Sequence, residues 1–396
     1  MAEIKVPFFK PSFSEDEKKA VCDVIDSCWL TTGSVTHNFE KEFAKFIGAE
    51  YALAVNSNTS GMILAMEAVG VKKGNCVITT PYTFVSTAAS AVHLGADVLF
   101  ADIEKDSYSI SPKSIEKLLK DDIEHKIKAI VPVHIAGNLC DMKKIRFLAE
   151  KYSTEQNKIY VIEDCAHSFP SRTKDGMAGT LADAGVFSFY ATKTITTGEG
   201  GMVTTNNKTL ADRMKKMRLH GMDRDAWDRY TSPKASWEYD IIAPGFKSNL
   251  PDILSAIGLV QLKKAELFFQ KRKKIVDFYN EKLKGCDFLT LPPDGEGNAW
   301  HLYLIKLVPE RLDCTRETFA KELQDKGIGI SMHFITLFHF TYWKEKYIDF
   351  RPQNFPNAEE HYQNTITIPL WPDMSKQMTE YVVSTIKETG KKHHVR

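Results

Sequence analysis

Residues 158–193 read KIYVIEDCAHSFPSRTKDGMAGTLADAGVFSFYATK and contain two short apolar segments. The first, Lys158 to Glu163, is followed at once by Asp164. The second, Ala184 to Phe189, leads to Lys193. Their length and their β-branched and aromatic content are typical of buried strands. We therefore expect two strands of one sheet here, with a carboxylate beyond the end of one and an amine beyond the end of the other.

The same alternation of apolar runs and amphipathic stretches extends from about residue 51 to about residue 219, which predicts an α/β domain with a mostly parallel sheet. Further strands are expected over Tyr51 to Val55, Cys76 to Thr79, Val98 to Ala101, Ile127 to Val133 and Met202 to Thr205. Helices are expected over Thr59 to Val69, Val85 to Leu94, Pro112 to Leu119, Asp141 to Tyr152 and Leu210 to Leu219. Ligands of such sheets bind beyond the carboxyl ends of the strands, so the loops there are the candidate site.

The pattern changes after Pro251, where a long amphipathic helix is expected from Asp252 to about Lys284. A strand over His301 to Leu307 and a helix over Thr315 to Lys326 follow. The length of 396 residues suits two domains. We therefore predict a large α/β domain over residues 1–251 and a smaller α+β domain over residues 252–396.

Composition excludes several classes of protein. The 52 basic residues are balanced by 51 acidic ones, so no nucleic-acid-binding surface is expected, and the basic run around Arg272 is interpreted as a solvated helix face. The seven cysteines form neither a CxxC pair nor a zinc-type cluster, which predicts reduced thiols, no metal and a cytoplasmic location. We expect no signal peptide and no membrane span, because no run of eighteen apolar residues occurs.

Asp164 and Lys193 are the first two candidates for chemistry. A buried carboxylate requires a positive partner, and a protonated pyridine ring would supply one and act as an electron sink. Burial lowers the pKa of a lysine, so that its neutral amine can attack an aldehyde. The alternatives are a helix N-cap for Asp164 and a surface position for Lys193.

Three further features would suit a cofactor with a phosphate and a planar ring. Thr59 and Ser60 begin a predicted helix, where hydroxyl and N–H groups form an anion site, although they could simply cap that helix. Ser188 could add a hydroxyl or could face a neighbouring strand. Phe84 could stack on the ring, the alternative being a place in the core.

A set of motifs spans essentially the whole chain, namely PFFKPS at 7–12, WLTTG at 29–33, NSNTSG at 56–61, TFVST at 83–87, EDCAH at 163–167, SFYATK at 188–193, GEGG at 198–201, HG at 220–221 and IPLWPD at 368–373. In these motifs the chain resembles the DegT/DnrJ/EryC1/StrS sugar aminotransferases, which are fold type I enzymes dependent on pyridoxal 5'-phosphate. The resemblance implies that Lys193 carries the cofactor and shuttles the proton, and that Asp164 pairs with the pyridine nitrogen. It also implies that His167 lies beside the ring, that Phe84 stacks on it, and that the phosphate is held by Thr59, Ser60 and Ser188.

Within that family, WLTT at 29–32, PVH at 132–134, HGMDRDAWDR at 220–229 and PGFKSN at 244–249 resemble enzymes that aminate C4 of a UDP-linked 4-keto sugar. The implied reaction moves an amino group from L-glutamate to a UDP- or dTDP-linked keto sugar, for glycan or lipopolysaccharide synthesis. Family members that act as dehydratases have His in place of Lys193, so the lysine favours transamination. The alternatives are a 3-keto substrate, a sensor that has lost catalysis, and an amino-acid aminotransferase that would use a C-terminal arginine.

The implied substrate carries a diphosphate and a sugar. Candidates for the diphosphate are Arg224, Arg229, Lys247 and His333, and candidates for the sugar are Thr31, Thr32 and His134, each with a structural role as the alternative. The resemblance also implies a homodimer with shared active sites. In it, the loop over Phe246 to Asn249 would cross over, and either Lys247 or Asn249 would contact the neighbouring cofactor phosphate.

Overall fold

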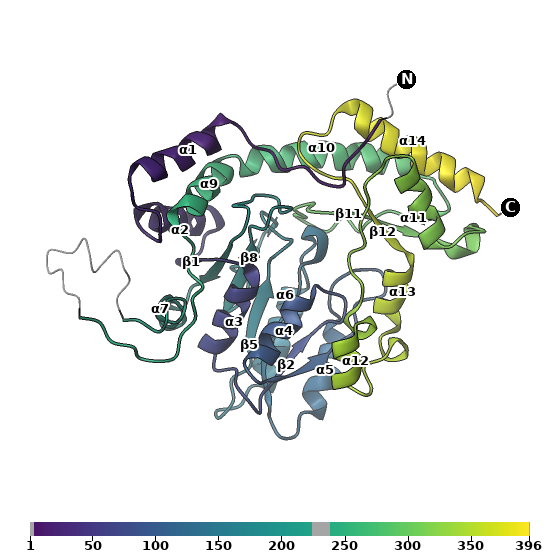
Figure 1. The fold of residues 1–396 in the computed structure, drawn as a ribbon. Coiled ribbons are helices and arrows are strands. Elements are labelled where there is room, and N and C mark those ends of the chain that lie inside the picture. The colour runs from purple at the N-terminus through teal and green to yellow at the C-terminus, as the bar shows by residue number, and fades with distance from the viewer. Residues whose placement is uncertain (1–3, 224–237, 396) are drawn as a thin grey trace.

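The computed structural model describes residues 4–223 and 238–395 (Figure 1). Its centre is a seven-stranded sheet in the order β1-β9-β8-β5-β4-β2-β3, in which only β9 runs antiparallel to its neighbours. The strands are β1 (Tyr51–Val55), β2 (Cys76–Thr79), β3 (Asp97–Phe100), β4 (Ile127–Ile130), β5 (Tyr160–Asp164), β8 (Ala184–Ser188) and β9 (Gly201–Thr205). The predicted α/β fold with a mostly parallel sheet is therefore confirmed.

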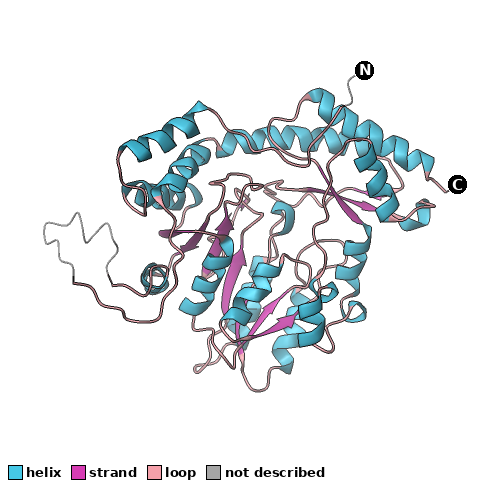
Figure 2. Ribbon diagram, in the orientation of Figure 1, coloured by secondary structure: helices cyan, strands magenta, loops and turns pink. Residues whose placement is uncertain are grey.

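Helices pack on the sheet from both sides, and Figure 2 shows the strands in the interior. These helices are α3 (Asn58–Ala68), α4 (Val85–His93), α5 (Pro112–Asp121), α6 (Met142–Tyr152) and α7 (Lys208–Met217). Alternate strand residues belong to different cores: Val77 and Ala129 pack with α3 and α4, whereas Ile78 and Ile130 pack with α5 and α6. This two-sided burial explains why the strands are apolar throughout.

A second sheet is built from β10 (Leu289–Thr290), β11 (Tyr303–Leu307) and β12 (Thr365–Ile368), all antiparallel. Its core includes residues of α10 (Ala265–Leu283), α11 (Arg316–Asp325) and α14 (Lys376–Lys392). The N-terminal segment joins this core, because Val6 is buried there and pairs with Ile328. The division at residue 251 stays a prediction.

The remaining elements are short or peripheral. They are α1 (Glu15–Asp26), α2 (Ser34–Ile47), α9 (Asp252–Lys263), α12 (Thr341–Lys346), α13 (Pro356–Asn364), the hairpin of β6 (Arg172–Thr173) and β7 (Gly176–Met177), and four 3₁₀ turns at Ile135–Gly137, Pro309–Arg311, Leu337–His339 and Pro352–Asn354. No helix within the described residues is long and apolar enough to cross a membrane.

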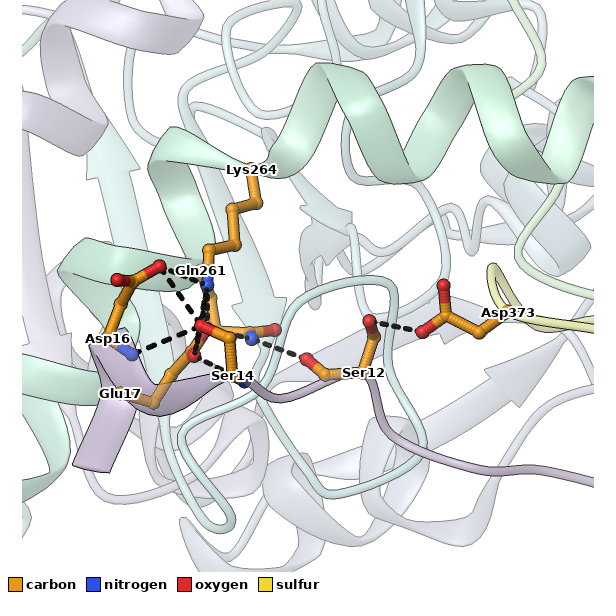
Figure 3. A network of polar contacts seen from close by, with 7 residues as sticks. All are labelled: Ser12, Ser14, Asp16, Glu17, Gln261, Lys264 and Asp373. Atoms are coloured by element: carbon orange, nitrogen blue, oxygen red, sulfur yellow. Dashed lines mark hydrogen bonds and ion pairs between the residues drawn. The ribbon is translucent and has the colours of Figure 1, made fainter.

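The prediction of one long helix after Pro251 was wrong, because α9 and α10 are separated at Lys264 (Figure 1). At this break, the Lys264 ammonium group donates hydrogen bonds to Ser14 Oγ and to both carboxylate oxygens of Glu17 (Figure 3). Gln261 donates to the carbonyl of Ser12, whose hydroxyl donates to Asp373. The lysine at the break therefore contacts the start of α1, next to the N-terminal segment that connects α1 to the second sheet.

The interpretation of Arg272 as part of a solvated helix face was also wrong. Arg272 is 1% exposed, and it lies on the same side of α10 as the buried Phe268, Val276 and Tyr279. These positions are three or four residues apart, which places them on one face of a helix. The basic composition around Arg272 therefore gave a wrong prediction for this residue, because its charged neighbours lie on the other faces of α10.

Asp252 holds the N-terminus of α2, which lacks a side-chain cap of its own. Its carboxylate accepts hydrogen bonds from the backbone N–H groups of Gly33 and Thr36, at 2.8 and 2.9 Å, and from the Thr36 hydroxyl at 2.6 Å. A side chain at Gly33 would collide with Trp29 and with Asp252 itself. This interaction joins the start of α9 to the start of α2.

We predict that Asp252→Ala lowers the free energy of unfolding by about 2–3 kcal/mol, because a buried, charged acceptor is removed from four donors, the N–H groups of Gly33, Val35 and Thr36 and the Thr36 hydroxyl. Asp277→Ala, which removes an exposed ion pair on α10, should cost less than about 0.5 kcal/mol. Urea-induced unfolding monitored by circular dichroism measures both. Equal effects of the two substitutions would contradict this account of Asp252.

Candidate active site

A cavity of about 370 Å³ lies beyond the carboxyl ends of β5 and β8, beside the N-termini of α3 and α4. Residues from distant parts of the sequence line it together. Of the predicted site residues, those that line the cavity are Thr59, Phe84, Asp164, His167, Ser188, Lys193 and His333. The position agrees with the expectation that the loops after the strands form the site.

Asp164 ends β5 and is 2% exposed. Its carboxylate accepts hydrogen bonds from the hydroxyl of Thr87 at 2.8 Å, the N–H of Ala166 at 3.1 Å and the side-chain amide of Asn58 at 3.4 Å. Burial raises the pKa of Asp164, while the hydrogen bonds from Thr87 and Ala166 lower it. The Ala166 contact caps a turn, as the N-cap alternative would require, but it leaves room for a cationic partner in the cavity.

Lys193 follows β8 and lines the same cavity. Burial lowers the pKa of Lys193 to about 8, although the nearby carboxylate of Asp164 raises it. A sizeable fraction of the amine is therefore neutral near neutral pH, which makes it nucleophilic. This environment does not fit the alternative of an ordinary surface lysine.

The N-terminus of α3 borders the cavity with hydroxyl groups. Ser57 is the N-cap, and its hydroxyl oxygen accepts the N–H of Ser60 at 3.1 Å. Ser57, Thr59 and Ser188 line the cavity, whereas Ser60 is not among the lining residues. The N–H groups of a first helical turn lack partners within the helix, so this corner suits a phosphate.

Aromatic side chains form another wall of the cavity. Phe84 is 60% exposed, which contradicts the alternative of a core position. The His167 ring stacks on Phe334, with centroids 5.3 Å apart, and its Nδ1 accepts the N–H of Ala136. Burial, together with Lys193 and His333, lowers the pKa of His167 well below its usual value. His167 is therefore neutral and can lie against a planar ring.

His134 does not line the cavity and is completely buried. Its Nε2 lies 3.0 Å from a carboxylate oxygen of Glu163, and its Nδ1 accepts the N–H of Cys140 at 3.2 Å. Glu163 also accepts the N–H groups of Gly179 and Leu181. Both ring nitrogens of His134 and both oxygens of Glu163 are thus occupied, so their closeness to Cys165 does not indicate a metal site. The core alternative fits His134 better than contact with a sugar.

The other predicted substrate residues lie apart from the cavity lining. Thr32 is buried, donates to the carbonyl of Leu250 and accepts from the Asn249 amide. Lys247 is exposed and donates to Asn249, and Thr31 is exposed next to Thr32. The Lys247 carbonyl accepts from the side chain of Asn56, so this segment adjoins the loop before α3. Arg224 and Arg229 lie outside the described residues.

Sequence reasoning missed the side chains that hold Asp164. Thr87 lies one helical turn after Phe84, so the motif that contained it could have indicated a shared face. Asn58 also donates to the carbonyl of Val186 on β8, which ties α3 to two strand ends. No sequence signal indicated that contact, because it depends on the pairing of β5 with β8.

The model of the DegT/DnrJ/EryC1/StrS aminotransferase family matches residues 11–387, nearly the whole chain. The chain belongs to this family. The predicted resemblance is therefore confirmed.

Several described proteins are similar to this chain over nearly its whole length. The chain is 38% identical over 389 residues to the spore coat polysaccharide biosynthesis protein SpsC of Bacillus subtilis, covering 98% of this chain and 97% of SpsC. Spr1654 of Streptococcus pneumoniae, described as a sugar aminotransferase, has a PMP-form structure with TM-score 0.89, 30% identity, and coverage of 98% of this chain and 99% of that one. For Helicobacter pylori PseC, an aminotransferase involved in the biosynthesis of pseudoaminic acid, the TM-score is 0.88, the identity 28%, and the coverage 98% and 100%.

The protein thus has the fold of a type I enzyme, and its cofactor is pyridoxal phosphate, which agrees with the PLP and PMP forms of Spr1654. The residues of the cavity fit this cofactor. Asp164 is a buried carboxylate that forms no salt bridge with any described residue, so a protonated ring nitrogen would complete it. Lys193 would hold the aldehyde carbon, and the start of α3 would hold the phosphate.

We predict that the apoprotein captures pyridoxal phosphate with a rate that rises with pH and levels off above about pH 8. Below that value the amine of Lys193 is protonated and cannot attack the aldehyde. The visible absorbance of the bound cofactor measures the rate. Asp164→Asn should lower the midpoint, because it removes the negative charge that stabilises the ammonium form. A midpoint near about 10.4, the value of a solvated lysine, would contradict this assignment.

Proposed function

We propose that this protein transfers an amino group from L-glutamate to a nucleotide-linked keto sugar, with a 4-keto sugar on UDP or dTDP as the preferred substrate. The product is an amino sugar for glycan or lipopolysaccharide synthesis. The observation that carries the proposal is that Lys193 and Asp164 line one cavity in a chain that belongs to this aminotransferase family. Full-length similarity to SpsC supports a role in polysaccharide synthesis.

The chain's own groups account for the proton transfers. When bound, pyridoxal phosphate supplies an electron sink that stabilises negative charge on the carbon that loses its proton. The neutral amine of Lys193 takes the proton from Cα of glutamate, and its ammonium form returns a proton to the sugar carbon in the second half of the cycle. A pKa of about 8 allows both roles near neutral pH. Asp164 keeps the ring nitrogen protonated by offering a buried negative charge.

His167 and Phe334, which stack on one another in the cavity wall, would lie against one side of the ring. Phe84 lies exposed at the cavity and offers a stacking surface. Lys247 and His333 are proposed to bind the diphosphate, and the same is proposed for Arg224 and Arg229.

We also propose a homodimer in which the segment over Phe246 to Asn249 approaches the neighbouring active site. Lys247 supports this proposal, because it is exposed and does not line its own cavity, while its backbone carbonyl accepts from Asn56 in the loop before α3. In a dimer, Lys247 or Asn249 would then contact the phosphate bound by the other subunit.

The proposed function predicts that the purified holoenzyme, given glutamate, aminates one or more substrates in a panel of UDP-, dTDP- and GDP-linked 4-keto and 3-keto sugars. Mass spectrometry of the product identifies the sugar and the aminated carbon. If only 3-keto sugars react, the alternative of a 3-keto substrate would replace the proposed 4-keto sugar. Bound cofactor whose absorbance never responds to glutamate would favour a sensor, and amination only of keto acids would favour an amino-acid aminotransferase.

Lys193→Ala should reduce turnover by about 10³-fold or more, because both proton transfers depend on this amine. The control is Lys208→Ala, which removes an exposed lysine paired with Asp212 on α7 and should leave turnover unchanged. Product formation by liquid chromatography measures both variants. Substantial turnover by Lys193→Ala would refute the proposed mechanism.

A further inference from the structure

A second, smaller cavity of about 40 Å³ adjoins the active-site cavity. His167, Thr192, Lys193 and His333 line both, so the two spaces meet at Lys193. The far wall of the small cavity includes His301, which precedes β11. A water molecule needs roughly 10–15 Å³ of such space, so the cavity could accept a group of about three heavy atoms.

His301 lines this cavity and has a buried ring nitrogen without a hydrogen-bond partner. The residue is 3% exposed, and its Nδ1 has no hydrogen-bond partner. Its ring lies 4.5 Å from that of His167, centroid to centroid. Burial, together with His167 and Lys193, lowers the pKa of His301 well below its usual value, so the ring is neutral and carries one N–H donor. Buried polar atoms without partners are rare in native proteins, and such an atom beside a cavity indicates a ligand or a water.

Arg272 stands behind His301 and is also incompletely satisfied. Its Nη1 donates to the carbonyl of His301 at 3.2 Å and to that of Leu370 at 2.8 Å, and both of these residues line the small cavity. Its Nε has no partner, and within residues 4–223 and 238–395 Arg272 forms no salt bridge with a carboxylate. Burial alone lowers the pKa of Arg272, to about 10. A buried positive charge without a counterion makes its surroundings favourable for an anion.

We propose that the small cavity binds the α-carboxylate of the amino donor, with His301 as its hydrogen-bond donor and Arg272 as a buried positive charge that positions and attracts it. This rests on the proposed function, in which an amino acid reacts beside Lys193. The α-carboxylate is two bonds from the amine, so it must bind next to that lysine. The cavity there is too small for a sugar nucleotide. His301 in its lining and Arg272 behind that lining each have an unsatisfied nitrogen.

The proposal makes Arg272 the arginine that an amino-acid site requires. The alternative of an amino-acid aminotransferase would use a C-terminal arginine, and the candidates for it, Arg311, Arg316 and Arg351, lie in sequence contexts that do not favour that role. Of these, Arg316 pairs with Glu317 and with the carbonyl of Tyr362, away from both cavities. Arg272 instead reaches the interior from α10 and does not touch the donor directly, so it is a positioning residue.

The test uses the holoenzyme and follows the first half of the reaction, which needs glutamate but no sugar. In His301→Phe and Arg272→Met, the glutamate concentration that gives half the maximal rate of absorbance change should rise about 10–100-fold, as for loss of a contact with a charged group. The KM for the keto sugar should stay within about twofold. Arg272→Lys, which keeps the charge, should recover part of the loss. Lys271→Met is the control, because Lys271 is an exposed neighbour on the same helix that pairs with Asp373.

A second measurement guards against misfolding and against failure of the proposed function. Calorimetry of 2-oxoglutarate binding to the aminated holoenzyme should show the same 10–100-fold weakening in His301→Phe, with cofactor absorbance and melting temperature confirming that the variant is folded. Unchanged affinity in folded His301→Phe, or an equal rise in the KM of donor and sugar, would overturn the carboxylate subsite and leave a water site. If no keto sugar reacts but the variants still bind glutamate and 2-oxoglutarate more weakly, the proposed sugar acceptor is wrong and the carboxylate subsite is supported.

Discussion

The burial of one carboxylate organises this site. Asp164 sits at the end of β5 at the level of the core, where an isolated negative charge is costly. Thr87 on α4 and Asn58 on α3 donate to it, so two helices are fixed to the strand end by the same group. Because those donors are neutral, the charge still requires a cation. In the mechanism that we propose, the cofactor's ring nitrogen would provide one from the cavity beside it.

The basic groups around the cavity share a second property. Burial lowers the pKa of Lys193, His167, His301 and His333, the last to about 3, so all but the lysine are uncharged near neutral pH. The site therefore offers polar contacts without a cluster of mutually repelling charges. Lys193 alone titrates in the working range, which suits a group that must gain and lose a proton in each cycle.

The sequence predicted the strands of the large sheet better than the break between α9 and α10 or the surroundings of polar side chains. Each predicted strand of the large sheet was found to within three residues at either end, because runs buried on both faces have little ambiguity. The prediction of a continuous helix after Pro251 was wrong. At the break, Lys264 contacts Ser14 and Glu17, which lie far away in the sequence and which local periodicity does not record. Arg272 and His134 were misjudged for a related reason: whether a polar side chain faces solvent, a core partner or a ligand depends on what packs against it.

By itself, the sequence determined the order of strands and helices along the chain, the family, the cofactor, and two groups, Asp164 and Lys193, that line the cavity. These depend on local pattern and on motifs at strand ends. Only the tertiary structure decided which side chains surround those groups. Asn58 contacts both Asp164 on β5 and Val186 on the neighbouring β8, and Thr87 on α4 contacts the same carboxylate. His301 lines the small cavity together with Lys193, and Arg272 donates to the carbonyl of His301. The contacts of Asn58 and Thr87 with Asp164 are between residues more than seventy positions apart, and they cannot be predicted from periodicity or composition.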